Sequence, residues 1–339
     1  MNIKTIAQLA GVSVATVSKI LNNYSDIGEE TRLRVLKIME ENGYRPSSSA
    51  RTLATKTSNL VGVVFAGEFN SDLDHPFFIA VLNSFKRQIG FFGYDLILFT
   101  NQRFLSNKED YLARCRHYHI DGCFIIAGDE IEPSVHRLAE SDIPCVGIDL
   151  KLEGERFAHI MSDNVKVASK VVEHFYLNGY RDIGLLGINR QSAVISIREQ
   201  SFKESIGNFG LSLREGSCFY SDGYDEECGY DAMMRRIDSG IPLPRALFAV
   251  SDMLAIGAMR ALKERGMSIP LDVAVVGCDD IETSRHTDPS LTTVRQDSEK
   301  IGRLAAMMLF DLLNKQSEAR TILVDPELAV RQSCGGLRS

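Results

Sequence analysis

The chain has 339 residues, of which 44% are hydrophobic and 24% are charged, and its formal net charge is −7. This length exceeds what one hydrophobic core usually supports, so two or more domains are expected. No apolar run reaches the roughly 18 residues of a membrane helix, and the amino terminus lacks the pattern of a signal peptide, so no membrane association is expected. Seven cysteines without a Cys-x-x-Cys pair indicate free thiols in a reducing compartment, which favours a cytoplasmic protein.

Charge is distributed unevenly along the chain. The first 60 residues contain eight Lys or Arg and five Asp or Glu, a net charge of +3, which leaves −10 for the remainder. A basic amino-terminal segment on an otherwise acidic chain indicates that this segment is the part that meets a polyanion.

Residues 3–44 have the pattern of three short helices. Thr5 and Gln8 have the spacing of a capping box, with Thr5 as the cap of the first helix. Gly11 marks a tight turn, after which Ser13 is placed to cap the second helix. These signals predict a helix, a short turn and a second helix, followed by a third helix that stops near Gly43.

This order of elements is typical of the helix-turn-helix, which places its second helix in the major groove of DNA. Val14 and Ala15 are small enough to approach base edges and to touch a thymine methyl group. Lys19, one turn later, can donate to guanine O6 and N7 or to phosphate. Short donors suited to phosphate oxygens are Ser13, Thr16, Ser18, Asn22, Thr31 and Tyr44. A three-helix domain that binds protein is the alternative.

Residues 47–57 have the composition of a linker, with Leu53 as their one large apolar side chain. From Leu60 onward, near-continuous apolar runs alternate with helical stretches, which predicts an α/β fold with parallel sheets. Segments 84–93 and 201–210 share seven residues in register. The repeat predicts two similar α/β lobes with a ligand site at the carboxyl ends of their strands, although chance similarity of two amphipathic helices is the alternative.

Known catalytic motifs are absent from the sequence. It contains no G-x-G-x-x-G, G-x-x-x-x-G-K-[ST], H-E-x-x-H or G-x-S-x-G pattern. His117 and His119 have a spacing that can hold a metal, but no acid or cysteine stands at a helpful distance along the chain. Neither a metal nor another cofactor is expected, and the protein is predicted not to be an enzyme.

The segments TIAQLAGVSVATVSKILN, EETRLRVLKIMEENGYRP and ARTLA resemble the lactose-repressor/galactose-repressor family of bacterial transcription regulators. The resemblance continues through HPFF, PCVGIDL, SDN, LAIGAMRALKERGMSIPLDVAVVGCDD and PSLTTVRQD, and it covers residues 5–333 in order. It implies an all-α helix-turn-helix headpiece and a two-lobed α/β effector domain with parallel sheets, similar to periplasmic sugar-binding proteins. The implied domains are 1–46 (headpiece), 47–59 (hinge helix and linker), 60–161 with 291–322 (N-terminal lobe) and 162–290 with 323–334 (C-terminal lobe).

For DNA, the resemblance implies a homodimer whose two headpieces contact adjacent half-sites of double-stranded operator DNA. Residues 47–54 are similar to the hinge helix of the family, and Ala50 and Leu53 are assigned to the DNA contact on this basis. Leu53 matches the residue that wedges into the minor groove and kinks the duplex. The sequence given ends without a leucine heptad, so a dimer is expected rather than a tetramer.

For the lobes, the resemblance implies a small-molecule effector, a sugar or sugar phosphate. Carboxylates and an arginine suit vicinal hydroxyl groups, and aromatic rings suit the C–H faces of a sugar. The effector-binding residues carried over by position are Phe77, Phe78, Asp149, Arg198, Tyr224, Ser251 and Asp279. The structural alternative is that Phe78 belongs to the core, or that Asp149 or Asp279 caps a helix.

Some positions depart from the family pattern. Lys19 stands where arginine is usual, which weakens bidentate recognition of guanine. Ser251 and Cys278 replace an asparagine and an aromatic residue near the expected effector site, which leaves the identity of the effector open. Asp72 or Asp74, in the loop before HPFF, is a further candidate.

Together these features predict a sequence-specific DNA-binding transcription regulator, a repressor of carbohydrate-utilisation genes, gated by an effector between two lobes. Whether the effector releases or promotes DNA binding stays open. The alternatives are a regulator whose effector is a phosphoprotein or a non-sugar metabolite, a sugar-binding protein without a DNA function, and an enzyme that uses the region between the lobes.

Overall fold

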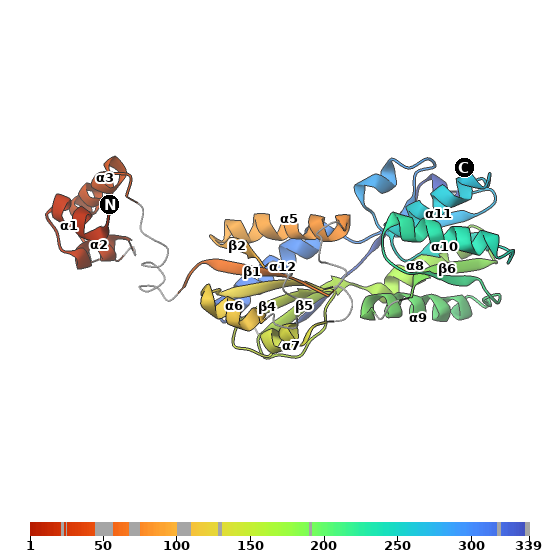
Figure 1. Cartoon of the computed structure of the whole chain (residues 1–339), viewed down its shortest axis with the longest axis horizontal. Helices are drawn as coiled ribbons and strands as arrows, with labels where there is room; N and C mark the ends of the chain where they lie inside the picture. Colours follow the sequence, from red (N-terminus) through yellow and green to blue (C-terminus); the bar gives the residue numbers. More distant parts are fainter. Residues whose placement is uncertain are drawn as a thin grey trace.

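The computed structural model describes residues 1–21, 24, 26–44, 57–67, 75–99, 110–127, 131–189, 192–316 and 320–335. Of the residues assigned from the sequence, Asn22, Ala50, Leu53, Asp72 and Asp74 lie outside these ranges. The described residues form a helical headpiece and two α/β lobes (Figure 1). None of the described helices has the length and apolar character that crossing a membrane requires.

The headpiece contains the three predicted helices: α1 (Ile3–Ala10), α2 (Val14–Leu21) and α3 (Glu29–Glu41). Their buried apolar side chains form one small core of Ile6, Ala7, Ala10, Val17, Ile20, Val35 and Met39. In α2, Val17 and Ile20 are buried and Leu21 packs partly against this core, whereas Val14, Ala15 and Lys19 are exposed.

The start of α1 differs from the prediction. The side chain of Asn2 accepts a hydrogen bond from the Thr5 N–H at 3.0 Å, so Asn2 is the cap. The predicted capping box, with Thr5 as cap, is therefore wrong, because an asparagine three residues earlier caps at least as well as threonine. The cap of α2 is confirmed: Ser13 Oγ accepts from the Thr16 N–H at 3.0 Å. Gly11 ends α1 with φ 64°, as a turn at glycine requires.

The N-terminal lobe is built on a parallel sheet in the order β11-β5-β4-β3-β1-β2. Its strands are β1 (Leu60–Ala66), β2 (Asp95–Leu98), β3 (Gly122–Ala127), β4 (Cys145–Ile148), β5 (Phe157–Ser162) and β11 (Thr321–Val324). Its helices are α5 (Pro76–Phe91), α6 (Tyr111–His117), α7 (Pro133–Ala139) and α12 (Ser298–Leu313). The helices α5 and α12 cover one face of the sheet, and α6 and α7 cover the other (Figure 1).

The C-terminal lobe repeats this plan, with a sheet in the order β12-β10-β9-β8-β6-β7 whose edge strand β12 runs antiparallel to β10. Its strands are β6 (Ile183–Ile188), β7 (Cys218–Ser221), β8 (Ala246–Ala249), β9 (Ala274–Asp279), β10 (Thr292–Arg295) and β12 (Glu327–Ala329). Its helices are α8 (Asn164–Leu177), α9 (Ala193–Asn208), α10 (Glu226–Asp238) and α11 (Asp252–Glu264), with short 3-10 turns η3 (Glu282–Arg285) and η4 (Gln332–Cys334).

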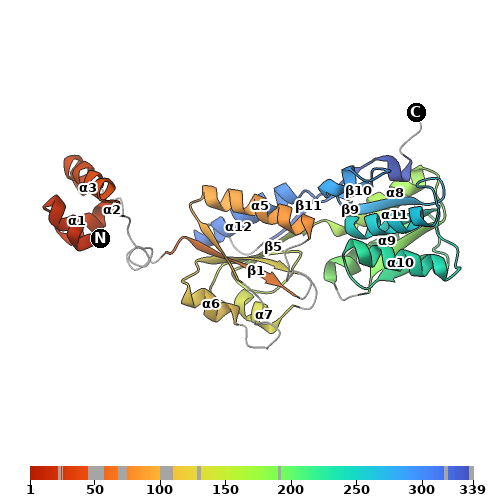
Figure 2. The ribbon, with the colours of Figure 1, turned by 45° about the horizontal axis from the view of Figure 1, so that its top comes forward.

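The repeated segments 84–93 and 201–210 lie at equivalent places in the two lobes. They form the ends of α5 and α9, each the helix that follows the first strand of its lobe, β1 or β6, which is second from the edge of the sheet. The repeat therefore marks two lobes of similar topology, which lie side by side along the long axis of the molecule (Figure 2).

Within the described residues, the chain passes between the lobes at three places, after β5, after β10 and after β11. The N–H of Asp163 donates to the carbonyl of Val324 at 2.9 Å, so the first and third passages lie side by side. The first passage follows Ser162, one residue from the predicted boundary.

The sheet pairing places the other two boundaries differently from the prediction. Thr292–Arg295, predicted in the N-terminal lobe, pair with β9 in the C-terminal lobe. Leu323 and Val324, predicted in the C-terminal lobe, pair with β5 in the N-terminal lobe. The backbone ladders extend each sheet a few residues beyond the predicted limits, so both passages come later in the chain.

Asp280 ties two of these passages to the C-terminal lobe. Its side chain is 2% exposed and accepts from Arg295 Nε at 2.7 Å and from Arg331, while Arg285 lies 3.5 Å away. Arg295 ends β10 just before the second passage, and Arg331 lies shortly after the third. Burial raises the pKa of Asp280, but the hydrogen bonds from Arg331 and Arg295 outweigh it and leave the pKa below its ordinary value.

Replacing Asp280 by Asn should lower the free energy of unfolding at pH 7 by about 2 kcal/mol or more, because three guanidinium groups lose a shared, buried counter-charge. Since the folded-state pKa is depressed, this stabilisation is present above pH ~4 and is lost as the pH falls further. Urea unfolding followed by circular dichroism measures the difference. The control Asp311→Asn, at a more exposed ion pair with Arg320, should change stability by less than ~1 kcal/mol; an equally small loss for Asp280→Asn would contradict the role of Asp280.

Candidate functional site

The outward side of α2 carries the residues assigned to DNA. Ser13, Val14, Ala15 and Lys19 are exposed, and Thr16 and Ser18 are half-buried. The hydroxyl groups of Ser13 and Thr16 lie 2.9 Å apart. Further away, Thr31 is half-buried in the first turn of α3, and Tyr44 packs partly against the headpiece core. The described part of α2 is therefore a smooth, mostly uncharged surface with one long side chain.

That long side chain has a partner that the sequence did not indicate. Lys19 Nζ lies 2.5 Å from Asp26 Oδ2, in the turn between α2 and α3, and the two side chains are 46% and 53% exposed. The hydrogen bond to Asp26 raises the pKa of Lys19, and the same bond lowers the pKa of Asp26. Lys19 is therefore a paired cation in this structure.

In the lobes, three predicted residues come together where the carboxyl ends of the two sheets face each other. Asp149 follows β4 of the N-terminal lobe, Asp279 ends β9 of the C-terminal lobe, and Arg198 lies on α9. The charge of Arg198 lowers the pKa of both carboxyl groups, so the three side chains lie within electrostatic range of one another. We refer to this group and its contacts as the interlobe site.

Arg198 is the fixed centre of the interlobe site. Its side chain is 4% exposed, its Nε donates to Asn164 Oδ1 at 2.7 Å, and its Nη1 donates to the carbonyl of Val250 at 2.8 Å. Asn164 begins α8 directly after the first passage between the lobes and is itself held by the carbonyl of Ser162. The guanidinium is therefore anchored both to a strand end and to the passage.

The two carboxylates are held in unusual backbone conformations. Asp149 has φ 54° and Asp279 has φ 134°, in the region that favours glycine. Non-glycine residues in such conformations cost on the order of 1 kcal/mol and are concentrated at functional positions. Both carboxylates stand at the carboxyl end of a strand, at the edge of the sheet where α/β proteins bind ligands.

Buried polar atoms without hydrogen-bond partners gather at this site. Within the described residues they include Asp149 Oδ1, Ser162 Oγ, Asp279 Oδ2 and Gln296 Oε1, while Asp279 Oδ1 accepts from Gln296 Nε2 at 2.6 Å. Folded proteins pair nearly all buried polar groups, so each of these atoms needs an explanation. A bound molecule with several donors would supply the missing partners.

Burial raises the pKa of Asp149 to about 6, with Arg198 opposing the shift and Asp279 adding to it. Burial also raises the pKa of Asp279, against the influence of His75 and Arg198. Two carboxyl groups thus share one guanidinium, and each of them is influenced by the charge of Arg198. The site is suited to a ligand with hydrogen-bond donors and poorly suited to an anionic ligand.

The other predicted effector residues have varied positions. Phe77 is 3% exposed and belongs to the core of the N-terminal lobe. Ser251 is 4% exposed and caps α11, accepting from the Leu254 N–H at 3.3 Å. Both side chains therefore have a structural role in this fold, Phe77 in the core and Ser251 as a helix cap. Phe78 is half-buried with its ring 5.3 Å from that of His75, and Tyr224 is also half-buried.

Three site residues were not singled out from the sequence: His75, Asn164 and Gln296. All three stand in motifs that carried the family resemblance, HPFF, SDN and PSLTTVRQD, and in the last two motifs no individual residue was singled out. Outside these contacts, Glu132 is a further buried acid beside the end of β1, where its Oε1 accepts from the Gly67 N–H at 3.0 Å and its Oε2 has no partner. No sequence signal marks Glu132.

No group of three His, Cys, Asp or Glu among the described residues has an arrangement that could hold a metal ion. All seven cysteines are free, with Cys115, Cys123, Cys145, Cys278 and Cys334 buried and Cys218 and Cys228 half-buried. Burial raises the pKa of Cys278, beside Asp279, so its thiol is neutral at physiological pH.

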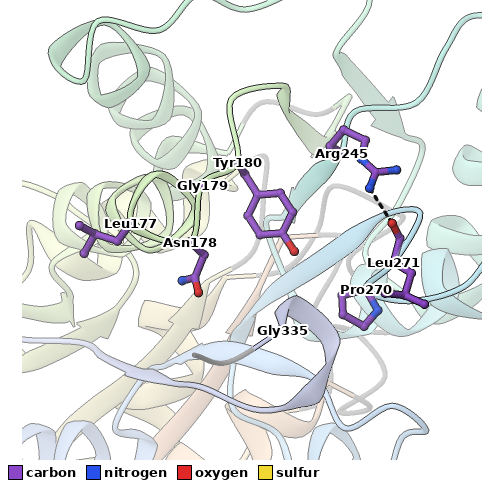
Figure 3. Close-up of a pocket in the computed structure, with 8 residues that line it drawn as sticks. All are labelled: Leu177, Asn178, Gly179, Tyr180, Arg245, Pro270, Leu271 and Gly335. Carbon is purple, nitrogen blue, oxygen red and sulfur yellow. Dashed lines mark hydrogen bonds between the residues drawn. The ribbon is translucent and has the colours of Figure 1, made fainter. Parts of the chain in front are cut away.

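A separate pocket lies in the C-terminal lobe, at the end of the sheet away from the interlobe site (Figure 3). It has a volume of about 540 Å³ and is lined by Leu177, Asn178, Gly179, Tyr180, Arg245, Pro270, Leu271 and Gly335. Arg245 and Pro270 come before the strands β8 and β9, so the pocket lies at the amino ends of the strands, and Arg245 Nη2 donates to the carbonyl of Leu271 at 2.6 Å. None of the residues predicted from the sequence lines it.

Comparison with known proteins agrees with this architecture. The model "Bacterial regulatory proteins, lacI family" matches residues 2–47, and "Periplasmic binding protein-like domain" matches residues 172–334. The chain is 30% identical over 334 residues to the HTH-type transcriptional repressor PurR of Proteus mirabilis, covering 98% of this chain and 96% of the relative. It is 29% identical over 339 residues to the HTH-type transcriptional regulator MalR of Clostridium butyricum, covering 98% and 99%. The lac repressor dimer bound to operator and the anti-inducer ONPF has the same fold, with a TM-score of 0.84, 23% identity and 98% of each chain covered.

The raised pKa of Asp149 predicts a pH dependence of stability. Because the folded protein binds this proton more tightly than the unfolded chain, whose Asp has a pKa of about 3.9, the ionised carboxylate destabilises the fold above pH ~6. In the absence of ligand, the natural protein should gain about 2 kcal/mol relative to Asp149→Asn as the pH falls from 7.5 to 4.5. Urea unfolding at each pH measures this gain, with the exposed acid variant Glu215→Gln as the control. Parallel pH profiles for the natural protein and Asp149→Asn would contradict the assignment.

Proposed function

The chain belongs to the lacI family of bacterial regulatory proteins and is a DNA-binding transcription regulator, and we propose that a neutral, polyhydroxylated molecule bound at the interlobe site controls its operator affinity. The observation that carries this proposal is the group of buried, unpartnered oxygen atoms on Asp149, Ser162, Asp279 and Gln296. Hydroxyl groups of one small sugar are donors of the right kind and number for these acceptors. The proposed action is repression, relieved or promoted by the sugar.

Charge favours a neutral sugar over a sugar phosphate, which the sequence also left open. Asp149 and Asp279 outnumber Arg198, and two of the guanidinium nitrogens of Arg198 already donate to Asn164 and Val250. A phosphate group there would meet two buried carboxylates, and like charges in a site of low polarity repel strongly. A neutral polyol adds no charge and completes the hydrogen bonds instead.

We propose that the protein acts as a homodimer in the cytoplasm, where a regulator meets its DNA. Phe91, at the end of α5, is 83% exposed, and the neighbouring edge strand β2 exposes Leu98 to 45%. Exposed apolar side chains beside a sheet edge are the kind of surface that a second copy buries. In such a dimer, the surface of α2 enters the major groove of each half-site, with Ala50 and Leu53 in the minor groove between them.

The test of the proposal is a pair of measurements on one variant. A panel of neutral sugars, sugar phosphates and other metabolites is first screened by thermal unfolding, in which a true ligand raises the melting temperature. Asp279→Asn should abolish both the stabilisation by the sugar and its effect on binding to a promoter fragment, while DNA binding without the sugar stays within about twofold. Glu215→Gln, an exposed acid on the same lobe, should respond as the natural protein does.

Results that would contradict the proposed effector are specific. If only sugar phosphates or non-sugar metabolites raise the melting temperature, the proposal that the effector is a neutral sugar is wrong. An Asp279→Asn protein that still responds to the sugar would remove the interlobe site as its location.

The minor-groove role of Leu53 is tested separately. Leu53→Ala should weaken binding to the promoter fragment by about tenfold or more, because the duplex no longer bends toward the protein and fewer of its phosphates are within reach. Sugar binding, measured by calorimetry, should not change. Leu177→Ala, at an apolar residue of the C-terminal lobe that is 70% exposed, is the matched control. Equal affinity of the Leu53→Ala and Leu177→Ala proteins for the fragment would remove the wedge.

A further inference from the structure

The ion pair between Lys19 and Asp26 joins two elements of the headpiece. Lys19 lies in the last turn of α2, and Asp26 lies in the turn that leads to α3. Their neighbours Ile20 and Ile27 are held by the headpiece core, Ile20 buried and Ile27 partly buried. The backbone at both ends of the pair is therefore fixed, and the Nζ to Oδ2 distance of 2.5 Å brings the ammonium to a defined point beside α2.

Stability does not account for this pair. With side chains that are 46% and 53% exposed, it is a surface ion pair, and such pairs contribute little to the folded state. A carboxylate beside a DNA-contacting surface also weakens binding, because it repels phosphates and cancels the one positive charge of α2. A compensating role in recognition is therefore expected for Asp26.

The chemistry of the two side chains supplies that role. A lysine ammonium has three donors on a flexible stem, so a free Lys19 would move among phosphates and base edges. Once Asp26 accepts one of the three N–H groups, the other two have fixed directions. Guanine presents two acceptors in the major groove, O6 and N7, whereas adenine presents one acceptor and one donor.

We propose that Asp26 is a positioning residue for guanine recognition: it holds the ammonium of Lys19 so that its two other donors meet O6 and N7 of one guanine in each half-site. The pair thereby restores the two-point contact that arginine makes alone. This inference rests on the proposed placement of α2 in the major groove. It assigns to Asp26 a share in sequence specificity at the expense of general affinity for DNA.

The experiment uses the full-length protein and duplexes selected by it from a random pool. In each selected duplex, every conserved guanine is replaced in turn by 7-deazaguanine, which lacks the N7 acceptor. The natural protein should lose about tenfold in affinity at one guanine per half-site, the lower end expected for a two-point contact. For the Asp26→Asn protein, the same 7-deazaguanine substitution should lower affinity by less than about threefold. This variant should also bind a random duplex more tightly than the natural protein, and its affinity should fall more steeply with salt, by about one phosphate contact.

Two further variants separate positioning from simple charge. Asp26→Glu keeps the carboxylate and should retain part of the discrimination at guanine. Lys19→Met should strongly weaken binding to the selected duplexes. The double variant Lys19→Met with Asp26→Asn should bind them better than Lys19→Met alone, because it no longer has an unpaired carboxylate that repels phosphates. The control is Lys37→Met with Glu41→Gln, another exposed pair, on α3, at 3.8 Å, which should not change discrimination.

The outcomes distinguish this inference from the function on which it rests. If Lys19→Met binds every duplex as the natural protein does, the placement of α2 fails and the inference fails with it. If Lys19→Met weakens binding but Asp26→Asn leaves both the discrimination and the salt dependence unchanged, the positioning role of Asp26 is overturned and the DNA contact by α2 stands.

Discussion

Two buried carboxylates that share one guanidinium set the character of the region between the lobes. Asp149 comes from the N-terminal lobe and Asp279 from the C-terminal lobe, so their repulsion acts directly on the separation of the lobes. Arg198 relieves only part of it, because its charge is divided between two partners. A molecule that donates to both carboxylates lowers the cost of bringing the lobes together, and a ligand of this kind favours the more closed of two states.

The order of neighbouring residues along the chain connects this site to the passages between the lobes. Asp279 faces the interlobe site, while the next residue, Asp280, binds Arg295 and Arg331 beside the second and third passages. Gln296, which donates to Asp279, is itself the first residue after β10. A displacement of Asp279 by a ligand would therefore reach, through adjacent backbone, the segments that join the lobes.

The sequence predicted the architecture well because its signals are local. Buried strands appear as apolar runs, and the turn at Gly11 with the cap at Ser13 is encoded within a few residues. The limits of the lobes were less predictable, since Thr292–Arg295 join the second sheet through pairing with β9, which no local pattern shows. At the site, Asp149, Arg198 and Asp279 were found through family motifs. Glu132 was missed because its burial depends on contacts distant in sequence.

The headpiece shows the same limit at smaller scale. Composition marks it as the basic part of an acidic chain, and this explains why DNA is met there and not by the lobes, whose negative charge repels phosphates. Yet the one lysine on α2 is paired with Asp26, seven positions away. A count of charges along the sequence includes Asp26 as an acid but does not reveal this pairing. In the proposed complex, attraction between the headpiece and the duplex then comes mainly from residues beyond α2, and α2 itself contributes selectivity. A surface with small side chains and almost no net charge gains little binding free energy from non-specific DNA. A regulator needs this property because non-specific sites greatly outnumber the specific ones.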